Sequence, residues 1–90
     1  MLAIAICESS LSPEAIHINK NGSTDGGIFQ LNSLHNARLK QMRIDRYNYL
    51  DNTNYALFLA QTEGLWHWNA SKKCQQSPST QKKVLALLDT

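Results

Sequence analysis

The chain has 90 residues, of which 42% are hydrophobic and 18% are charged. This composition is typical of a folded globular chain and excludes a disordered one. The length allows one small domain with a marginal core, so we expect residues 1–90 to form a single domain. The formal net charge of +2 is too weak to indicate nucleic-acid binding, although it favours approach to an anionic polymer.

The first segment, Met1 to Cys7, is apolar but short. It lacks the basic start and the small-residue cleavage site of a signal peptide, and no segment of the chain reaches the length of a membrane span. The segment instead predicts the last turns of a helix that carries Glu8 at its C-terminal end. We expect either a compact domain or a module of a larger protein whose targeting signals lie elsewhere.

Glu8 directly follows this apolar segment, so its backbone lies at the edge of apolar packing. A carboxyl group held there is desolvated, which disfavours its charged form and raises its pKa. A protonated carboxyl near neutral pH is what a general acid needs to protonate a leaving group. Glu8 is therefore the predicted catalytic acid, and the alternative is an ordinary surface glutamate at a helix end.

Ser12 and Pro13 form a helix-start signal, with Ser12 as N-cap and Pro13 at the first helical position. They predict about one helical turn, which ends before the turn-forming residues between Asn19 and Gly27. Downstream, apolar Phe29 and Leu31 alternate with two amides, a pattern that predicts a short strand with one wet face.

The two amides, Gln30 and Asn32, then point to the same side of that strand. They offer paired donors and acceptors that suit sugar hydroxyl and acetamido groups. We expect a short β-hairpin or turn-strand region from about Thr24 to Asn32, beside a helical core.

Three further segments follow in chain order. Leu34 to Ile44 predicts a helix with Ser33 as a cap, and Arg46 to Asn54 predicts a polar loop. Either Asp51 or Asn52 is expected to cap the helix after that loop.

The segment from Thr53 to Gly64 is the clearest predicted helix, ended by its glycine. Its apolar stripe consists of Tyr55, Phe58, Leu59 and Thr62, with Ala56 and Ala60 as a flank that permits close packing. Ser77 and Pro78 open a final helix. The predicted buried face of that helix consists of Val84, Leu85, Leu87 and Leu88.

The segment from Cys7 to Ser33 resembles the core of the lysozyme superfamily. It is similar to the small lytic transglycosylases and phage-type lysozyme-like domains, with the C-type lysozymes as relatives. The residues that carry the resemblance lie in one register: Glu8, Ser9, Pro13, Ala15, Asn19, Asn21, Gly22, Ser23, Asp25, Gly27, Gln30, Asn32 and Ser33. Weaker similarity continues at Asn52 and in Gly64-Leu65-Trp66-His67-Trp68, which resemble two downstream family signatures without their Pro and with one Trp displaced.

The resemblance implies an α+β fold, mostly α, with a cleft between the hairpin region and the helices. It also implies cleavage of the β-1,4 bond between N-acetylmuramic acid and N-acetylglucosamine in peptidoglycan, without a cofactor. Glu8 and Asp25 match the catalytic positions, and the predicted substrate-binding residues are Ser23, Gln30, Asn32, Trp66 and Trp68. The expected partner is the peptidoglycan glycan strand, and the expected location is periplasmic, extracellular or virion-associated.

Asp25 leaves two interpretations open. It lies where the C-type lysozymes carry a second carboxylate, which stabilises or attacks the oxocarbenium-like centre. Alternatively, it is a turn residue beside Gly26 and Gly27, and the enzyme is a lytic transglycosylase that works with Glu8 alone. For the chain as a whole, a non-catalytic glycan-binding module of the same fold is a further alternative.

The aromatic and cysteine residues also allow alternatives. Trp66 and Trp68 either stack on sugar faces or pack in the core. Cys7 and Cys74 either form a disulfide or remain two buried free thiols, because sequence separation does not fix geometry. His17, His35 and His67 have no ligand pair at metal spacing, so no metal site is expected. We expect a monomer.

Overall fold

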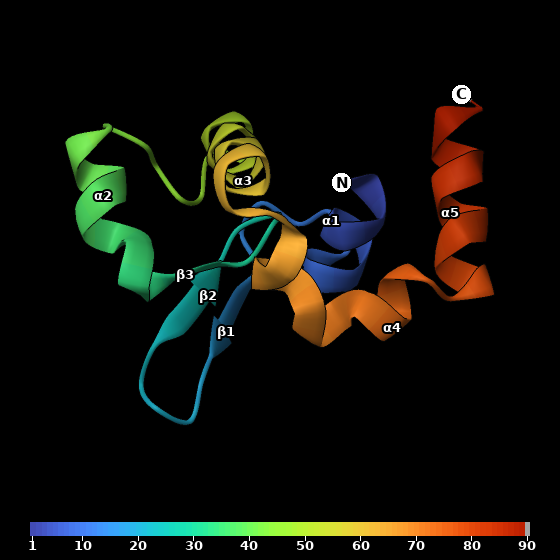
Figure 1. Cartoon of the computed structure of the whole chain (residues 1–90), viewed down its shortest axis with the longest axis horizontal. Helices are drawn as coiled ribbons and strands as arrows, with labels where there is room; N and C mark the ends of the chain where they lie inside the picture. Colours follow the sequence, from blue (N-terminus) through green and yellow to red (C-terminus); the bar gives the residue numbers. More distant parts are fainter. Residues whose placement is uncertain (90) are drawn as a thin grey trace.

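The computed structural model describes residues 1–89 and consists mainly of helices around one small antiparallel sheet (Figure 1). The elements are α1 (Leu2–Ser9), β1 (Ile16–Ile18), β2 (Thr24–Gly26), β3 (Leu31–Asn32), the 3₁₀ helix η1 (Ser33–His35), α2 (Asn36–Gln41), α3 (Tyr49–Glu63), the 3₁₀ helix η2 (Leu65–Ser71), α4 (Lys72–Gln75) and α5 (Pro78–Leu88). This confirms the predicted α+β, mostly helical fold class. None of the described helices is both long and apolar enough to cross a membrane.

Helix α3 supplies the centre of the core. Its buried residues recur at helical spacing and are Asn52, Tyr55, Ala56 and Leu59. They pack with Ile4 and Ala5 of α1, with Phe29 and Leu31 of the hairpin region, with Leu39 of α2 and with Trp68 of η2. The predicted helix is confirmed, but its stripe is shifted, since Phe58 is 36% exposed and Thr62 is exposed.

Helix α3 begins earlier than predicted, inside the expected polar loop. The N-cap is Asn48, whose side-chain oxygen accepts hydrogen bonds from the backbone N–H groups of Leu50 at 3.1 Å and Asp51 at 3.0 Å. The prediction that Asp51 or Asn52 caps this helix is therefore wrong. Asn52 is instead fully buried, because the extra turn rotates it towards the hairpin region.

The sheet also differs from the prediction at its first strand. No helix starts at Ser12, and β1 pairs with β2 in an antiparallel register that places Ile16 opposite Gly26 and Ile18 opposite Thr24. Strand β3 then pairs with β2, with Asp25 opposite Asn32. The predicted helix at Ser12 does not form because a single helical turn gains little stability. The β-branched residues of β1 instead gain hydrogen bonds by pairing with β2.

The predicted helix from Leu34 to Ile44 is shorter and divided. Asn32, and not Ser33, caps its first part, since its side-chain oxygen accepts a hydrogen bond from the Leu34 N–H at 3.0 Å. A 3₁₀ turn, η1, leads into α2, which buries Leu39 in the core. The segment therefore begins at the edge of the sheet and ends at Gln41.

The C-terminal helix begins as predicted but does not bury the predicted face. Ser77 caps α5 by accepting the Thr80 N–H at 3.2 Å, and Pro78 is the first helical residue. Leu85 and Leu88 are 68% and 72% exposed, and the buried residue is Thr80. The reason is tertiary: α5 lies at the end of the molecule opposite α2 (Figure 1), where it packs mainly against α1 and α4.

The two cysteines form a disulfide between α1 and α4. Cys7 and Cys74 are 67 positions apart in the sequence, and their Cα atoms are 6.0 Å apart. Of the two alternatives left open by the sequence, the structure therefore contains the cross-link. It fixes the residue before Glu8 to the helical segment after η2.

Candidate active site

A cavity of about 300 Å³ lies between the hairpin region and the helices. Its lining joins residues from distant parts of the chain: Glu8, Asp25, Gln30, Leu31, Asn32, Leu34, His35, Leu59, Trp66, His67, Trp68 and Ala70. All of the predicted site residues except Ser23 line this cavity. The expected cleft between the hairpin and the helices is therefore present.

Glu8 lies in the last turn of α1 and is half-buried. Its helix is anchored by the buried side chains of Ile4 and Ala5, and it ends where Ser10 adopts a left-handed conformation. Burial raises the pKa of the Glu8 carboxyl above its ordinary value of 4.5; a side-chain hydrogen bond from Ser71 opposes the rise, and the charge of Asp25 adds to it. A carboxyl in this position can hold a proton at higher pH than an exposed glutamate does.

Asp25 faces the same cavity from the central strand, β2. One carboxylate oxygen accepts a hydrogen bond from the amide of Asn32 at 2.8 Å, and the other accepts one from the amide of Asn19 at 3.1 Å. Two donors on two different segments fix the direction of this carboxylate. Its negative charge adds to the rise in the pKa of the Glu8 carboxyl, which lines the same cavity.

Ser23 supports this arrangement from behind the cavity wall. Its hydroxyl oxygen accepts hydrogen bonds from the amides of Asn19 at 3.1 Å and Asn32 at 3.3 Å, and the hydroxyl lies 2.6 Å from the Asn21 side-chain oxygen, to which it donates. Ser23 therefore holds the two amides that hold Asp25. In the structure its contacts are to the hairpin and not to the cavity.

Gln30 and Asn32 reach the cavity by different routes. Asn32 lies in β3, but Gln30 precedes the strand and has a φ of 51°. The Gln30 amide donates to the backbone oxygens of Ala15 at 3.1 Å and Gly27 at 2.9 Å. The prediction of a strand through residue 30 is wrong, because this left-handed residue turns the chain into β3. Both side chains nevertheless line one cavity.

The two tryptophans occupy contrasting positions. Trp68 is 3% exposed, and its indole N–H donates to the Phe29 backbone oxygen at 2.8 Å. Trp66 is 59% exposed and stacks on the ring of His67 at a centroid distance of 3.9 Å. Trp68 thus packs in the core and also lines part of the cavity. Trp66 lines the cavity too, but its ring is exposed to solvent.

The most important support that the sequence reasoning missed is the buried amide of Asn52. Its oxygen accepts the Phe29 N–H at 2.9 Å, and its amide group donates to the backbone oxygens of Gly26 at 3.0 Å and Arg46 at 2.7 Å. A Cβ atom on Gly27 would overlap the Asn52 amide. Asn52 therefore ties α3 directly to the turn before β3. The weak similarity to a family signature at Asn52 was the available signal.

Arg46 provides a second unpredicted support. Its guanidinium donates to the backbone oxygens of Thr24 at 3.2 Å and Leu31 at 3.1 Å, and to the Thr24 hydroxyl at 3.0 Å. It thereby joins β2 to β3 from outside the cavity. No local pattern distinguishes this arginine from the others, because the strand residues that it joins lie at least 15 positions away.

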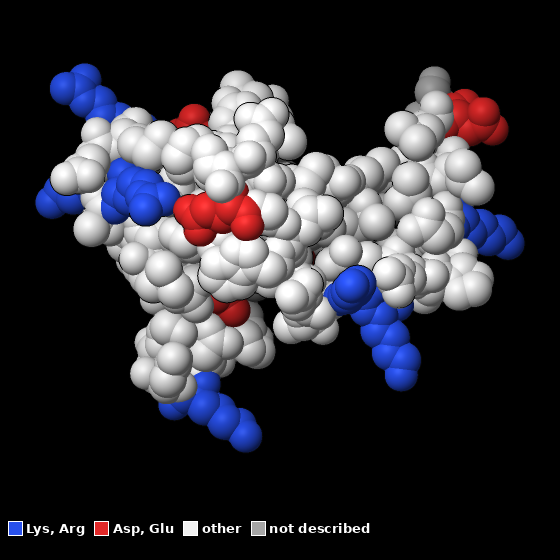
Figure 2. Space-filling view, in the orientation of Figure 1, with Lys and Arg blue, Asp and Glu red and all other residues white. Residues whose placement is uncertain are grey.

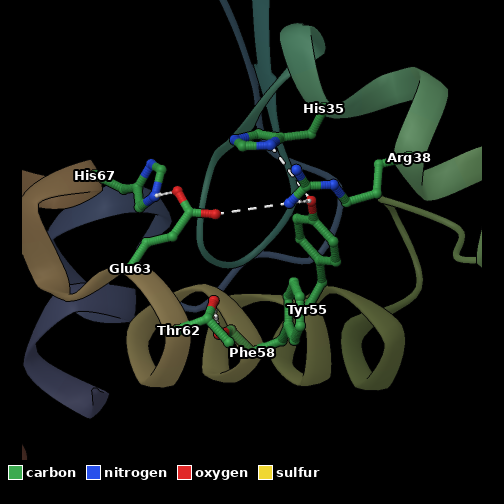
Figure 3. A network of polar contacts seen from close by, with 7 residues as sticks. All are labelled: His35, Arg38, Tyr55, Phe58, Thr62, Glu63 and His67. Carbon is green, nitrogen blue, oxygen red and sulfur yellow. Dashed lines mark hydrogen bonds and ion pairs between the residues drawn. The ribbon is translucent and has the colours of Figure 1, made fainter.

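A polar network forms the far rim of the cavity, between η1, α2, α3 and η2 (Figure 3). The Glu63 carboxylate contacts His67 at 3.0 Å and Arg38 at 3.6 Å. The Tyr55 hydroxyl lies 3.4 Å from both Arg38 Nη1 and His35 Nδ1. Burial lowers the pKa of His35, and the neighbouring His67 and Arg38 lower it further, whereas Glu63 raises it.

Among residues 1–89, no group of three or more His, Cys, Asp or Glu side chains is arranged to hold a metal ion. Lys and Arg side chains are scattered over the face shown in Figure 2 and do not gather in one basic patch there. Among the described residues, the polar and aromatic groups that line the cavity are two carboxyl groups, two amides, two imidazoles and two indole rings.

This architecture, with an acid at the end of a helix facing an amide-bearing hairpin, defines a lysozyme-like domain. A family model described as a lysozyme-like domain, of the SLT type, matches residues 1–68, so the chain belongs to that family. The match includes every residue that lines the cavity except Ala70.

Two relatives share part of this region. Invasion protein IagB of Salmonella typhimurium is 52% identical over 44 residues, which is 49% of this chain and 28% of that protein. Protein IpgF of Shigella flexneri is 48% identical over 40 residues, which is 44% of this chain and 26% of that protein. The matched segment thus spans about a quarter of the length of these relatives. No solved structure matches the chain significantly.

Proposed function

We propose that the chain is a peptidoglycan lytic transglycosylase that cleaves the β-1,4 bond between N-acetylmuramic acid and N-acetylglucosamine. The observation that carries this proposal is the half-buried Glu8 carboxyl, with its raised pKa, in one cavity with Asp25, Gln30 and Asn32. Membership of the lysozyme-like family supports the same substrate class.

In the proposed mechanism Glu8 first acts as the acid. It donates its proton to the glycosidic oxygen, the bond to the muramoyl C1 breaks, and an oxocarbenium-like centre develops. The ionised Glu8 then accepts the proton of the muramoyl 6-hydroxyl as that oxygen attacks C1. The product is a 1,6-anhydromuramoyl end, and no water is consumed. The charge of Asp25 favours the protonated form of Glu8 before the reaction.

The proposed substrate contacts follow from the cavity lining. Trp66 offers an exposed ring on which a sugar face can stack, and Asn32 and Gln30 offer amide groups to sugar substituents. Trp68 is proposed to contribute an edge of the wall. Ser23 is proposed to act indirectly, because its hydroxyl oxygen accepts a hydrogen bond from the Asn32 amide and so helps to orient that amide.

A hydrolase of the lysozyme type is the second candidate, and the geometry of Asp25 favours it specifically. Hydrogen bonds from Asn19 and Asn32 orient this carboxylate while it faces the cavity with Glu8. A carboxylate so placed can stabilise the positive charge that develops at C1, after which water attacks. A non-catalytic glycan-binding module remains the third candidate.

We also propose that the domain works outside the cytoplasm, in the periplasm, in the extracellular space or on a virion. The Cys7–Cys74 disulfide supports this location, because such bonds persist in oxidising compartments.

Mass spectrometry of digested peptidoglycan separates the three candidates. Anhydro products support the transglycosylase, reducing-end products support the hydrolase, and the two differ by one water. The Glu8→Gln variant should bind glycan strands but lose about 10²- to 10⁴-fold in turnover, since general acid catalysis contributes a factor of that size. A folded wild-type chain that binds glycan strands without cleaving them would establish the binding module.

A further inference from the structure

Ser71 and Gln75 lie behind the wall of the active-site cavity, next to the helix that carries Glu8. Ser71 ends η2 and Gln75 ends α4, and both of these elements pack against α1. Both side chains are half-buried, and neither lines the cavity. Both residues also lie beyond residues 1–68, the part of the chain that the lysozyme-like family model matches. They are therefore placed to influence the proposed reaction without touching the substrate.

We propose that Ser71 is a positioning residue for the Glu8 carboxyl, and that the Gln75 amide makes the Ser71 hydroxyl proton available to it. This inference rests on the proposed function, in which Glu8 gives up and regains a proton. As Glu8 loses its proton, the Ser71 hydroxyl turns towards the developing carboxylate and donates a hydrogen bond to it. Ser71 keeps its own proton throughout, so it orients the acid and takes no part in proton transfer.

The Ser71 hydroxyl has one proton and two neighbouring acceptors. Its oxygen lies 3.2 Å from the backbone oxygen of Trp68, and it also forms a hydrogen bond with the Glu8 side chain. A hydroxyl hydrogen rotates to suit its surroundings, so the single proton goes to the stronger acceptor. An ionised carboxylate is that acceptor, because charge-assisted hydrogen bonds are roughly twice as strong as neutral ones. The direction of this hydroxyl therefore follows the charge on Glu8.

Gln75 removes the competition for the Ser71 proton. Its Nε2 atom donates two hydrogen bonds, one to the Trp68 backbone oxygen at 2.9 Å and one to the Ser71 hydroxyl oxygen at 2.9 Å. The Trp68 oxygen therefore keeps a donor when the Ser71 proton turns to Glu8, and no acceptor is left unpaired. The bond to Ser71 occupies one lone pair of the hydroxyl oxygen and leaves its proton to be donated.

The position of Gln75 is fixed from two sides. It directly follows Cys74, which the disulfide joins to Cys7, the residue before Glu8. Its backbone oxygen accepts a hydrogen bond from the Gln81 amide of α5 at 2.6 Å. The cross-link thus holds both ends of the arrangement, the acid on α1 and the amide on α4. Donors fixed in this way need no rearrangement as charge develops, which is what makes them effective in a transition state.

The other groups around Glu8 act in the opposite direction to Ser71. The titratable side chains that share its cavity are Asp25 on β2, His35 on η1 and His67 on η2. Burial and the charge of Asp25 raise the pKa of Glu8, whereas the hydrogen bond from Ser71 lowers it. The helices α4 and α5, which also pack against α1, carry exposed lysines: Lys72, Lys73, Lys82 and Lys83.

The sign of the change in pKa therefore distinguishes two effects of a substitution at Ser71. Loss of the hydrogen bond alone should raise the pKa of Glu8 further, because the charged form loses a donor. A general loosening that let water reach Glu8 would lower this pKa towards its ordinary value, since it would weaken the effect of burial.

NMR titration of the Glu8 side-chain carboxyl carbon tests the inference without any turnover, and Glu8→Gln assigns the signal. The pKa of Glu8 should be higher in Ser71→Ala than in the wild type. It should stay unchanged in Ser71→Thr, which retains a hydroxyl, and in Ser79→Ala, an exposed position on α5 that does not line the cavity. An unchanged or lower pKa in Ser71→Ala, or an equal rise in Ser71→Thr, would overturn the inference.

Gln75→Ala keeps the inference testable if Ser71→Ala does not fold. Without the Gln75 amide, the Trp68 oxygen competes for the Ser71 proton, so the pKa of Glu8 should rise, but less than in Ser71→Ala. The Ser71→Ala/Gln75→Ala double variant should have the same Glu8 pKa as Ser71→Ala, because Gln75 acts through the hydroxyl that is already absent. No rise in Gln75→Ala, or a further rise in the double variant, would overturn the role given to Gln75.

The pH profile of peptidoglycan turnover gives a second readout. Ser71→Ala should lower kcat about tenfold, the low end for a hydrogen bond to a charged group, because Glu8 is half-buried. KM should not change, since Ser71 does not line the cavity. The loss of rate at alkaline pH, where Glu8 gives up its proton, should move to higher pH. A move to lower pH would indicate a loosened site and overturn the inference.

The kinetic results also separate this inference from the proposed function. Cleavage of glycan strands by the wild type together with an unchanged kcat in Ser71→Ala leaves the proposed function intact and overturns only the positioning role. A folded wild type that does not cleave glycan strands overturns the proposed function and, with it, the positioning role that rests on it.

Discussion

The two walls of the candidate active site are held by different forces. The hairpin wall, which carries Asp25 and Asn32, is positioned by hydrogen bonds that the side chains of Asn19, Asn52 and Arg46 donate to it. The helical wall, which carries Glu8, is positioned by apolar packing in the core and by one disulfide. The cavity lies where these two differently built walls meet.

The difference has a physical reason. Strands of two or three residues bury little apolar surface, so polar side chains must fix their orientation. Hydrogen bonds are directional and dispersion is not, which makes the hairpin wall precise and the helical wall robust. Substitutions in the helical wall should therefore lower stability first, and substitutions in the hairpin wall should lower activity out of proportion to stability.

The largest expected loss of stability follows removal of the disulfide. The Cys7→Ser/Cys74→Ser double variant frees a loop with a sequence separation of 67, which should lower the free energy of unfolding by about 4 kcal/mol in the chain-entropy model. Urea unfolding checks the value. A reducing agent should destabilise the wild type and leave the double variant unchanged. Equal stability of the two proteins would contradict this account of the helical wall.

The next largest loss of stability should follow a substitution that opens a new cavity in the core of the helical wall. Ile4 is 3% exposed, lies in the core under α1 and does not line the active-site cavity. Ile4→Ala should lower the free energy of unfolding by about 2 to 4 kcal/mol, while the folded fraction retains its turnover of peptidoglycan. Leu57→Ala is the matched control on α3, because Leu57 is 38% exposed.

The hairpin wall should respond differently to the loss of Asn52. Asn52→Ala leaves the buried N–H of Phe29 without its acceptor and removes two donated hydrogen bonds. We expect a loss of about 1 to 3 kcal/mol in stability. Under conditions that keep both proteins folded, this variant should lose more activity than Ile4→Ala.

Asn54→Ala is the control for Asn52, since Asn54 is exposed on the same helix. Comparable specific activities of the Asn52 and Ile4 variants would show that the two walls do not differ in the way described.

The smallest expected effect concerns the proton on Glu8. Because its pKa is raised in the folded state, the folded chain holds this proton more tightly than the unfolded chain does. Its contribution to stability is therefore fully present below the ordinary value of 4.5 and is lost as the pH rises through the raised value. The difference in unfolding free energy between the wild type and Glu8→Gln should decline over that window. A difference that increases with pH would mean that Glu8 is stabilised in its charged form.

Local sequence determined the parts of this protein whose signals are short in range. The apolar turn before Glu8 predicted a half-buried carboxyl at a helix end. The turn residues between Asn19 and Gly27 predicted the hairpin region, and the helical period from Tyr55 to Leu59 predicted the central helix. These features depend on backbone preference and on neighbours within one or two turns, which a single sequence displays directly.

Tertiary structure alone decided which distant residues meet. The pairing of Cys7 with Cys74, the burial of Asn52 against Phe29 and the exposure of Leu85 on α5 all depend on the path of the chain between them. Periodicity shows that a helix has an apolar face, but burial also requires a partner surface, and α5 lies at one end of the molecule, against α1 and α4 (Figure 1). The sequence thus encoded the chemistry of the site, and long-range packing fixed its geometry, because contact between segments is a property of the folded chain.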